Sequence, residues 1–475
     1  MGNAAVLLKT MGHEVAGSDS GVYPPMSDVL KDAGIDLFEG FEAEEMIEWS
    51  PDRVVVGNAV SRGNPQVEKL LSTRQIPFVS LPQLIGEDLI GNRPAIVVAG
   101  THGKTTTTAL TAFSLYNLGY NAGYLVGGVP LDLPSGNELG DFSAPFVIEG
   151  DEYDSAFFDK RSKFIHYRPR ILILNNLEFD HGDIFRDLQD IARSFSHLLR
   201  IVPSNGFVLM NGDDPNLRDL PAAPWTNTIS VGVGKHNDLV IDQFGEDASG
   251  SRFNLIWRGE VVHQVKWSMH GVFNARNLAM AILSSCLAQN LAHPEDKILD
   301  NPFADTPIAD FSQCLGVKRR QEQLFDSPSL TILSDFAHHP TAIAGALESL
   351  RARSPDRKIL ACFEPRSNTA VTNIFQDRFA QSLALADHAL IGQVHRAERI
   401  PTEERINPEQ MIQFIRSEGK SGEAFSTNQE LGAYLKKREF ATPGEKMLVV
   451  FFSNGSFDGV IQEFVELAER NFVPS

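Results

Sequence analysis

Between positions 94 and 108 the chain combines residue types that suit phosphate binding. Residues 95–99 are all apolar and predict a buried strand, and Gly100-Thr-His-Gly-Lys-Thr105 then turns into a helix expected to start at Thr106. In such a turn, backbone N–H groups face an anion, the lysine reaches outer phosphates and the last threonine can ligate Mg²⁺. The predicted nucleotide-phosphate site comprises Gly100, Thr101, His102, Gly103, Lys104, Thr105 and Thr106. Val98 stands where the longer phosphate-loop pattern has glycine, and a glycine-rich turn with a surface lysine is the weaker alternative.

Two further apolar runs end in groups able to hold a metal ion. Residues 144–148 lead into Glu149, and residues 171–174 lead into a polar stretch that ends at His181. The carboxyl ends of parallel strands share one sheet edge, which also carries the phosphate loop. Carboxylates at 149, 151, 152 and 154 would repel one another without a cation, so Glu149 is the predicted Mg²⁺ ligand. A solvated acidic loop is the alternative for Glu149, and a helix cap or core position is the alternative for His181.

Polar residues recur at strand ends in the last third of the chain. The strand-like runs 330–333, 358–363 and 446–452 precede the polar stretches 334–340, 364–369 and 453–457. This arrangement predicts a second parallel α/β sheet whose polar edge faces a ligand. Before it, Arg319 and Arg320 form a short basic hinge, for which solvated surface charge is the alternative. Asn274 and Asn277 precede an expected apolar helix over 278–287, where amides either cap the helix or contact a base.

The first 90 residues predict a smaller α/β domain. Residues 2–11 predict a helix, and short strands are expected within 12–19, 53–57 and 76–79. Ser18, Asp19 and Asn58 stand at strand ends, where such sheets bind ligands, although capping of helices or turns explains them equally well. A dinucleotide-type fold would begin with a strand and a glycine-rich turn. We find neither, and expect that the start is placed late or that this domain is incomplete.

Composition narrows the class of protein. The 475 residues predict about three domains, and the net charge of -19 argues against a nucleic-acid-binding surface. Cys286, Cys314 and Cys362 lack metal-site spacing and are expected to be buried thiols in a reducing compartment. Without a signal peptide or an apolar run of about 18 residues, we expect a soluble cytoplasmic protein with no membrane partner.

These motifs together resemble the Mur ligases, the ATP-dependent amide-bond-forming enzymes of peptidoglycan synthesis. The motifs that carry the resemblance are Gly100 to Thr105, Glu149-x-Asp-Glu-x-Asp154, Asn176-Leu-Glu-x-Asp-His181, Asn274-x-x-Asn277, Arg319-Arg320 and Asp335-Phe-Ala-His-His-Pro340. Residues 157–164, 173–181, 364–369 and 453–455 look like one branch, which joins UDP-N-acetylmuramate to the recycled tripeptide L-alanyl-γ-D-glutamyl-meso-diaminopimelate. The resemblance covers essentially the whole chain.

The resemblance implies an α/β fold of three domains. These are a Rossmann-like UDP-sugar domain over 1–90, a central ATPase-type domain over 93–313 and a Rossmann-like C-terminal domain over 316–475 that closes over ATP and binds the peptide. Thr105, Glu149 and His181 would hold Mg²⁺, with Lys104, Glu149 and His181 acting in catalysis. The remaining implied contacts are Asn274 and Asn277 to adenine; Arg319 or Arg320, Asp335 and His338 to ATP; Ser18, Asp19 and Asn58 to the UDP-sugar; and Arg366, Asn368 and Asn454 to the peptide.

Other readings remain open from the sequence. A sister branch of the family adds only L-alanine, and a folate polyglutamate ligase would share the phosphate loop but lack the UDP-sugar domain. A nucleotide-binding scaffold or sensor without catalysis is the alternative from another class. We expect a monomer or a weak homodimer.

Overall fold

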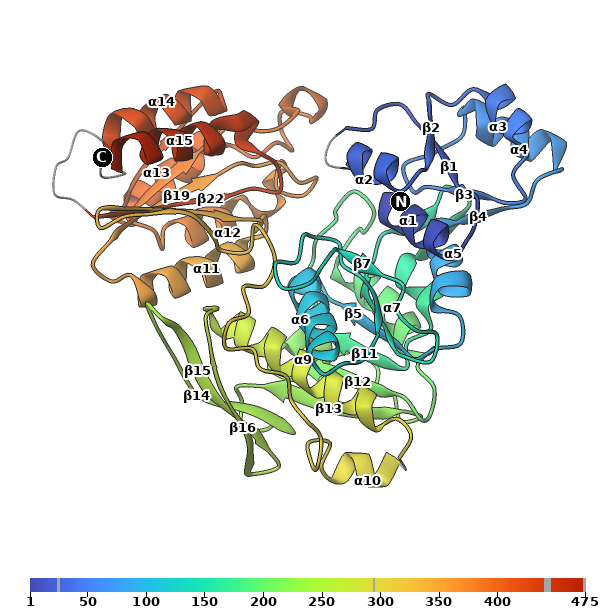
Figure 1. Ribbon diagram of the computed structural model, residues 1–475. Helices are drawn as coiled ribbons and strands as arrows, with labels where there is room; N and C mark the ends of the chain where they lie inside the picture. Colours follow the sequence, from blue (N-terminus) through green and yellow to red (C-terminus); the bar gives the residue numbers. More distant parts are fainter. Residues whose placement is uncertain (24–25, 294, 440–445, 473–475) are drawn as a thin grey trace.

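The computed structural model describes residues 1–23, 26–293, 295–439 and 446–472. They form three lobes, with the first lobe and the C-terminal lobe both resting on a central one (Figure 1). Within these residues, none of the helices combines the length and the apolar character that crossing a bilayer requires. All three cysteines are free and buried, as predicted.

The first lobe contains two separate pairs of parallel strands. β1 pairs with β2, and β3 pairs with β4, without a ladder joining the two pairs. The predicted helix and all three predicted strands are confirmed, although each strand is shorter than expected. The elements are α1 (Gly2–Thr10), β1 (Ala16–Asp19), α2 (Met26–Asp32), β2 (Asp36–Glu39), α3 (Ala43–Trp49), β3 (Val54–Val56), α4 (Pro65–Thr73) and β4 (Phe78–Ser80).

The central lobe is built on a ten-stranded sheet in the order β16-β15-β14-β13-β12-β11-β5-β8-β6-β7. Its strands from β14 to β6 run parallel, whereas β15 and β16 at one end and β7 at the other are joined by antiparallel pairing. The elements are α5 (Leu81–Leu84), η1 (Ile85–Ile90), β5 (Ala95–Ala99), α6 (Lys104–Asn117), β6 (Gly123–Leu125), β7 (Asn137–Glu138), β8 (Phe146–Gly150), β9 (Asp154–Ala156), β10 (Asp159–Ser162), η2 (Lys163–Tyr167), β11 (Ile171–Leu174), α7 (Leu188–Leu199), β12 (Phe207–Asn211), α8 (Pro215–Arg218), β13 (Asn227–Gly232), β14 (Leu239–Asp247), β15 (Gly250–Trp257), β16 (Glu260–Trp267), α9 (Val272–Asn290) and α10 (Glu295–Asp300).

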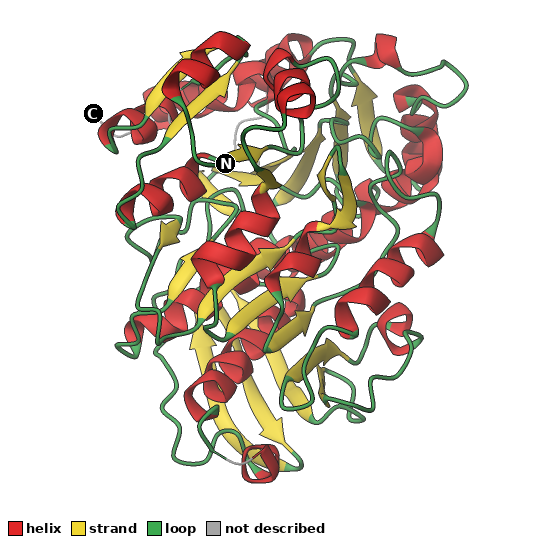
Figure 2. Ribbon diagram, turned by 90° about the vertical axis from the view of Figure 1, so that its right-hand side faces the viewer, coloured by secondary structure: helices red, strands yellow, loops and turns green. Residues whose placement is uncertain are grey.

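Strand β5 is buried on both faces because helices cover both sides of the sheet (Figure 2). Ile96 and Val98 belong to the core that includes α6 and α9, while Val97 and Ala99 belong to the core that includes α7. A continuous apolar run is what such a strand requires. The packing fixes the end of β5, and with it the position of the phosphate loop.

Two helix starts differ from the sequence prediction. Helix α6 begins at Lys104 rather than at Thr106, and α9 begins at Val272 rather than near Leu278. The first turn of α9 closes directly after Gly271, which has φ of 90°, because the N–H groups of Asn274 and Ala275 donate to the Gly271 carbonyl. Asn274 therefore lies inside the helix and not before it.

The C-terminal lobe has a six-stranded sheet in the order β17-β18-β22-β19-β20-β21, parallel except for β17. Since β18, β22 and β19 are neighbours, their polar carboxyl ends lie side by side, as predicted. The elements are β17 (Glu322–Asp326), β18 (Leu330–Asp335), α11 (Pro340–Arg353), β19 (Lys358–Phe363), η3 (Asn373–Phe375), α12 (Gln376–Leu383), β20 (His388–Ile391), η4 (Ala397–Arg399), α13 (Pro408–Ser417), β21 (Ser421–Ala424), α14 (Asn428–Glu439), β22 (Met447–Phe452), η5 (Phe457–Gly459) and α15 (Val460–Phe472).

Candidate active site

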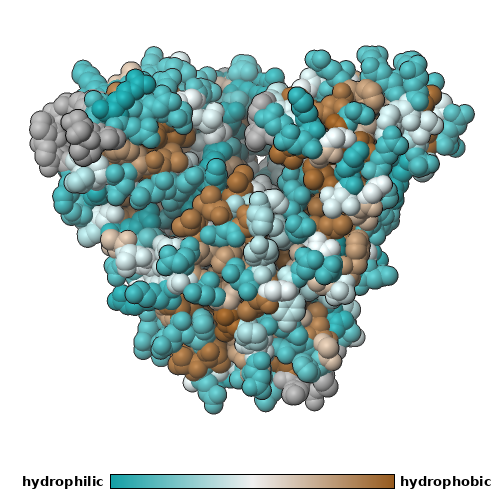
Figure 3. Space-filling view, viewed as in Figure 1, coloured by the Kyte–Doolittle hydropathy of each residue, from teal (hydrophilic) through white to brown (hydrophobic). Residues whose placement is uncertain are grey.

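A cavity of about 940 Å³ lies between the central and C-terminal lobes. The molecular surface is hollowed where the two upper lobes face each other above the central one (Figure 3). Predicted site residues that line the cavity come from both lobes. They are Lys104, Glu149 and His181 from the central lobe, and His338, Arg366, Asn368 and Asn454 from the C-terminal lobe.

The phosphate loop is held from behind by asparagine side chains. Asn176 accepts from the N–H of His102 at 2.7 Å and donates to its carbonyl at 3.1 Å. Gly103 has φ of 81°, and a Cβ there would come within 2.7 Å of Asn277 Oδ1 and 3.0 Å of Asn175 Nδ2. Only glycine fits this close approach. The loop is therefore preformed, with Thr106 already buried in the helix behind it.

The ammonium group of Lys104 is enclosed by acceptors. It donates to the carbonyl of Gly100 at 2.6 Å and to both carboxylate oxygens of Glu152, at 2.9 and 3.2 Å. Burial acts to lower the pKa of Lys104, but Glu152, Asp151 and Glu149 outweigh it and hold the pKa above its ordinary value. Lys104 is thus a fixed positive charge at the start of α6.

Glu152 connects Lys104 to His181. Its side chain is 3% exposed, and Oε1 lies 3.1 Å from His181 Nε2. Burial acts to raise the pKa of Glu152, but Lys104 and His181 reverse this and lower it to about 2. Burial likewise acts to lower the pKa of His181, whereas Glu152 and Asp180 raise it above the ordinary value. The three side chains favour one another's charged forms.

Thr105 and Glu149 supply neighbouring oxygen ligands. The Thr105 hydroxyl donates to Glu149 Oε2 at 3.0 Å, and the other carboxylate oxygen accepts from the N–H of Gly127. Burial raises the pKa of Glu149, and the bonds from Gly127 and Thr105 oppose this only in part. A buried carboxylate beside a hydroxyl fits Mg²⁺, which prefers oxygen ligands and would offset the cost of burying the charge. His181 contacts Glu152 instead, so its predicted metal role stays a prediction.

The two hinge arginines have different surroundings. Arg319 donates to the carbonyl oxygens of Ser453 and Gly455, which ties the hinge to the C-terminal sheet. Both guanidinium groups lie over the Phe336 ring, which lines the cavity, that of Arg320 at 4.7 Å and that of Arg319 at 5.2 Å from the ring centre. Burial lowers the pKa of Arg320, against the attraction of Asp335 and Glu149. The phosphate contact implied for Arg319 or Arg320 stays a prediction.

Asp335, at the end of β18, and His338, in the loop that follows, are both anchored by backbone groups. The carboxylate of Asp335 accepts from the N–H groups of Ala337 at 2.7 Å and Gln321 at 2.9 Å. Burial raises the pKa of Asp335, with Arg320 opposing it, and burial lowers the pKa of His338. His338 Nδ1 lies 2.9 Å from the Phe336 carbonyl. Their predicted nucleotide contacts stay predictions.

The residues predicted to bind a peptide lie on the C-terminal wall. Arg366 donates to Glu364 at 3.2 Å, and a Cβ on Gly455 would come within 2.4 Å of its side chain. Asn368 donates to Asp183 of the central lobe at 2.9 Å. Asn454 lines the cavity, and its Oδ1 is buried without a hydrogen-bond partner among the described residues. The peptide contacts implied for these three residues stay predictions.

The residues predicted to contact adenine and the UDP-sugar do not line the cavity. Asn274 and Asn277 are buried in the first turns of α9, where Asn277 donates to Asn274 at 3.3 Å. Ser18 accepts from Gln66 at 2.9 Å, and Asp19 accepts from the N–H of Gly21 at 3.2 Å. Asn58 donates to the Asp154 carbonyl at 2.5 Å, which joins the first lobe to the central one. The sugar and adenine contacts implied for these residues stay predictions.

Sequence reasoning missed two groups of site residues. Glu152 was one member of a recognised acidic cluster, but nothing in the spacing marked it as the partner of Lys104. His395, Arg396 and Arg399 line the cavity, and the available signal was three basic residues within five positions after a strand.

Comparisons with known proteins match the whole chain. The description "Mur ligase family, catalytic domain" matches residues 1–90, "Mur ligase middle domain" matches 98–285 and "Mur ligase, glutamate ligase domain" matches 319–455. The chain is 39% identical, over 98% of its length and 95% of the relative, to a UDP-N-acetylmuramate–L-alanyl-gamma-D-glutamyl-meso-2,6-diaminoheptandioate ligase of Escherichia coli strain K12.

Two further relatives place this match in context. The crystal structure of a murein peptide ligase from Psychrobacter arcticus is 35% identical with a TM-score of 0.65, covering 100% of this chain and 97% of that one. A UDP-N-acetylmuramate–L-alanine ligase of Desulfitobacterium hafniense is 30% identical, over 84% of this chain and 83% of its own. The chain belongs to the Mur ligase family.

Proposed function

We propose that this enzyme joins UDP-N-acetylmuramate to the tripeptide L-alanyl-γ-D-glutamyl-meso-diaminopimelate, using ATP. The observation that carries the proposal is one cavity with two chemically different walls. On the central wall Lys104 suits a triphosphate and Glu149 suits the Mg²⁺ that accompanies it, while Arg366 and Asn454 on the C-terminal wall suit a peptide with free carboxylates. The name of the Escherichia coli relative, matched at 39% identity, describes the same reaction.

The first step is phosphoryl transfer. The sugar carboxylate attacks the γ-phosphate of ATP, which gives an acyl phosphate and ADP. Lys104 supplies a fixed positive charge for the outer phosphates, and the N–H groups of the loop from Gly100 to Thr105 hold them in place. Bound Mg²⁺ at Thr105 and Glu149 would neutralise further phosphate charge. Since Lys104 also pairs with Glu152, the nucleotide must share or displace that pairing.

The second step forms the amide bond. The α-amine of the peptide attacks the acyl carbonyl, and phosphate leaves. Arg366 and Asn454 both line the C-terminal wall. In this proposal Arg366 holds a carboxylate of the peptide with two parallel hydrogen bonds, and Asn454 accepts from a peptide N–H. The C-terminal wall thereby orients the amine toward the central wall.

The proposal is tested by competition between amine substrates. Purified protein is supplied with ATP, Mg²⁺ and UDP-N-acetylmuramate, together with equal amounts of the tripeptide and L-alanine. We expect the ligated product to contain the tripeptide, measured by mass spectrometry alongside release of ADP. Preferential use of L-alanine would move the enzyme to the activity named for the Desulfitobacterium hafniense relative. ATP binding without ADP release, with all substrates present, would support a non-catalytic module instead.

A further inference from the structure

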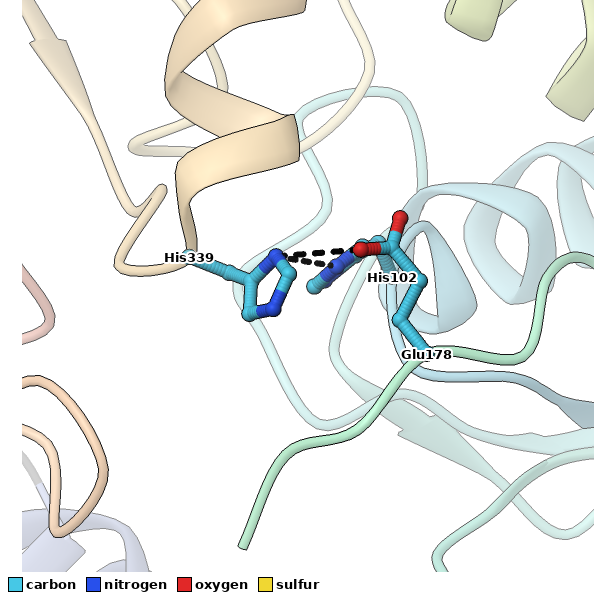
Figure 4. A group of neighbouring side chains, drawn as sticks. All are labelled: His102, Glu178 and His339. Carbon is cyan, nitrogen blue, oxygen red and sulfur yellow. Dashed lines mark hydrogen bonds and ion pairs between the residues drawn. The ribbon is translucent and has the colours of Figure 1, made fainter. Parts of the chain in front are cut away.

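Three side chains from two lobes converge beside the phosphate loop. His102 belongs to the loop, Glu178 follows β11, and His339 directly precedes α11 of the C-terminal lobe (Figure 4). His102 Nε2 lies 3.1 Å from His339 Nδ1, which in turn lies 3.6 Å from Glu178 Oε2. We propose that these residues form a transition-metal site of the Zn²⁺ class, separate from the predicted Mg²⁺ ligands, which clasps the C-terminal lobe to the phosphate loop.

The geometry suits a small tetrahedral ion. Ligand atoms about 2.0–2.1 Å from Zn²⁺ at tetrahedral angles are separated by roughly 3.3 Å. The measured separations of 3.1 and 3.6 Å bracket that value, and one ligand atom of each residue lies within 4.8 Å of the other two. Two imidazoles and one carboxylate are a common zinc donor set, with a fourth position left for water.

A simple hydrogen bond leaves part of this arrangement unexplained. One proton can join His102 to His339, but the Glu178 carboxylate stands 3.6 Å from His339 Nδ1, too far for a hydrogen bond. The rings lie with their centres 4.5 Å apart and are tilted by 41°, so they are not stacked face to face. A cation between the three ligand atoms would bind both rings and would share Glu178 Oε2 with the hydrogen-bond donors that already contact it.

The surroundings hold each ligand in place. The backbone of His102 is fixed by Asn176, and the His339 ring is 1% exposed and packs edge-on against Phe375 at 5.0 Å. Glu178 Oε2 accepts from Thr341 at 2.7 Å and from Arg378 at 3.3 Å. The carboxylate is therefore oriented by neighbours from the C-terminal lobe, as supporting residues orient metal ligands elsewhere. Arg378 would share this carboxylate with the ion.

A bound ion would stabilise one arrangement of the central and C-terminal lobes. Two ligands are fixed to the central lobe and the third to the C-terminal lobe, so the ion can be fully bound only when the lobes are in the arrangement seen here. Binding an ion to this arrangement alone stabilises it in proportion to the ion's concentration and affinity. A Zn²⁺-class ion would thus favour the arrangement of the two lobes seen here.

Titration of the full chain with Co²⁺ tests the site, because four-coordinate Co²⁺ absorbs visible light strongly. We expect one such ion per chain, displaced by Zn²⁺, with affinity at least ~100-fold weaker in His339→Gln and in Glu178→Gln. His181→Asn is the matched control, since it alters the other predicted metal position and leaves this cluster intact. Its Co²⁺ spectrum should equal that of the wild type.

The outcomes separate this proposal from the ligase proposal. Absence of the Co²⁺ bands in the wild type, their survival in both His339→Gln and Glu178→Gln, or their loss in His181→Asn would each overturn the metal site. If His339→Gln fails to fold, judged by circular dichroism, Glu178→Gln decides alone. None of these results depends on which amine substrate is ligated, so the substrate competition can fail or succeed independently.

Discussion

The two walls of the cavity differ in how deeply their charged side chains are buried and in how they are bonded. On the central wall, Lys104, Glu152 and His181 are bonded to one another within 3.2 Å and are largely buried. On the C-terminal wall, Arg366 touches Glu364, while Arg396 and Arg399 stand beside it on the loop that includes η4. Arg399 is 68% exposed, against 16% for Lys104.

This difference reflects what each wall is proposed to bind. A triphosphate carries concentrated charge, so its site gains from a dry, fixed array whose charges cost no reorganisation when the phosphoryl group moves. A peptide with several carboxylates is better bound by long side chains that donate directed pairs of hydrogen bonds, and exposed guanidinium groups provide these. Substitutions on the central wall should therefore affect the rate of the reaction, and those on the C-terminal wall should affect the affinity for the peptide.

The largest effect is expected for Lys104→Ala. Removing the ammonium group leaves the outer phosphates without their fixed positive charge, and kcat should fall by about 10³-fold. Steady-state release of ADP in the presence of both other substrates measures this. Lys104→Arg is the matched control, which keeps the charge and should retain part of the activity. If Lys104→Ala turns over at a rate close to that of the wild type, the proposed role of the central wall in catalysis is wrong.

A smaller effect is expected for Glu149→Gln. The substitution keeps the side-chain shape but removes the charge that balances a divalent cation, so the Mg²⁺ concentration for half-maximal activity should rise by about 100-fold. Thr105→Ser keeps the hydroxyl that meets Glu149 and should respond to Mg²⁺ as the wild type does. An unchanged Mg²⁺ dependence in Glu149→Gln would place the ion elsewhere.

The C-terminal wall is tested by Arg366→Ala. Loss of a charge-assisted contact worth about 1.5–3 kcal/mol should raise KM for the tripeptide by roughly 10- to 100-fold. KM for ATP should stay the same, because the phosphate site lies on the other wall. The tripeptide KM of Arg366→Lys should lie between those of the wild type and Arg366→Ala, since lysine keeps the charge without the planar pair of donors. A lower kcat at unchanged tripeptide KM would contradict the division between the walls.

Local sequence signals predicted those features of the fold and the site that depend on residues close together in the chain. The apolar run 95–99, the glycines at 100 and 103 and the polar ends of β18, β19 and β22 all reflect burial and turn geometry within a few residues. The start of α9 was not predicted correctly, because the residue that precedes the helix is Gly271, which has no side chain to cap it. The start is set instead by the N–H groups of Asn274 and Ala275, which donate to the Gly271 carbonyl, and no local sequence pattern predicts these bonds.

Long-range pairings could not be predicted in the same way. The bond from Lys104 to Glu152 joins residues 48 positions apart, and it depends on β8 lying next to β5 in the sheet. The contact of His102 with His339 spans 237 positions and two lobes. The motif resemblance named the loop and the cluster that contain these residues, but only the folded arrangement shows which atoms meet.

The smallest effect concerns a contact between the same two lobes that lies outside the cavity lining. Arg353 of α11 lies 2.7 Å from His270 Nδ1, and burial, with help from Arg353, lowers the pKa of His270 to about 4. In the unfolded chain His270 takes up a proton near its ordinary pKa of 6.5, so its contribution to stability is present above that pH and is lost as the pH falls toward about 4. The free energy of unfolding, measured in urea at about pH 7 and about pH 5, should fall between these pH values in both proteins. The fall should be on the order of 1 kcal/mol smaller in His270→Gln than in the wild type, after allowance for the partly exposed ring.

Activity of the His270→Gln variant assayed at about pH 7 should change little, because the contact touches neither wall. Equal pH dependence in the two proteins would show that His270 titrates as it does in the unfolded chain, and a large loss of activity would show that this contact, as well as the cavity walls, sets the catalytic geometry.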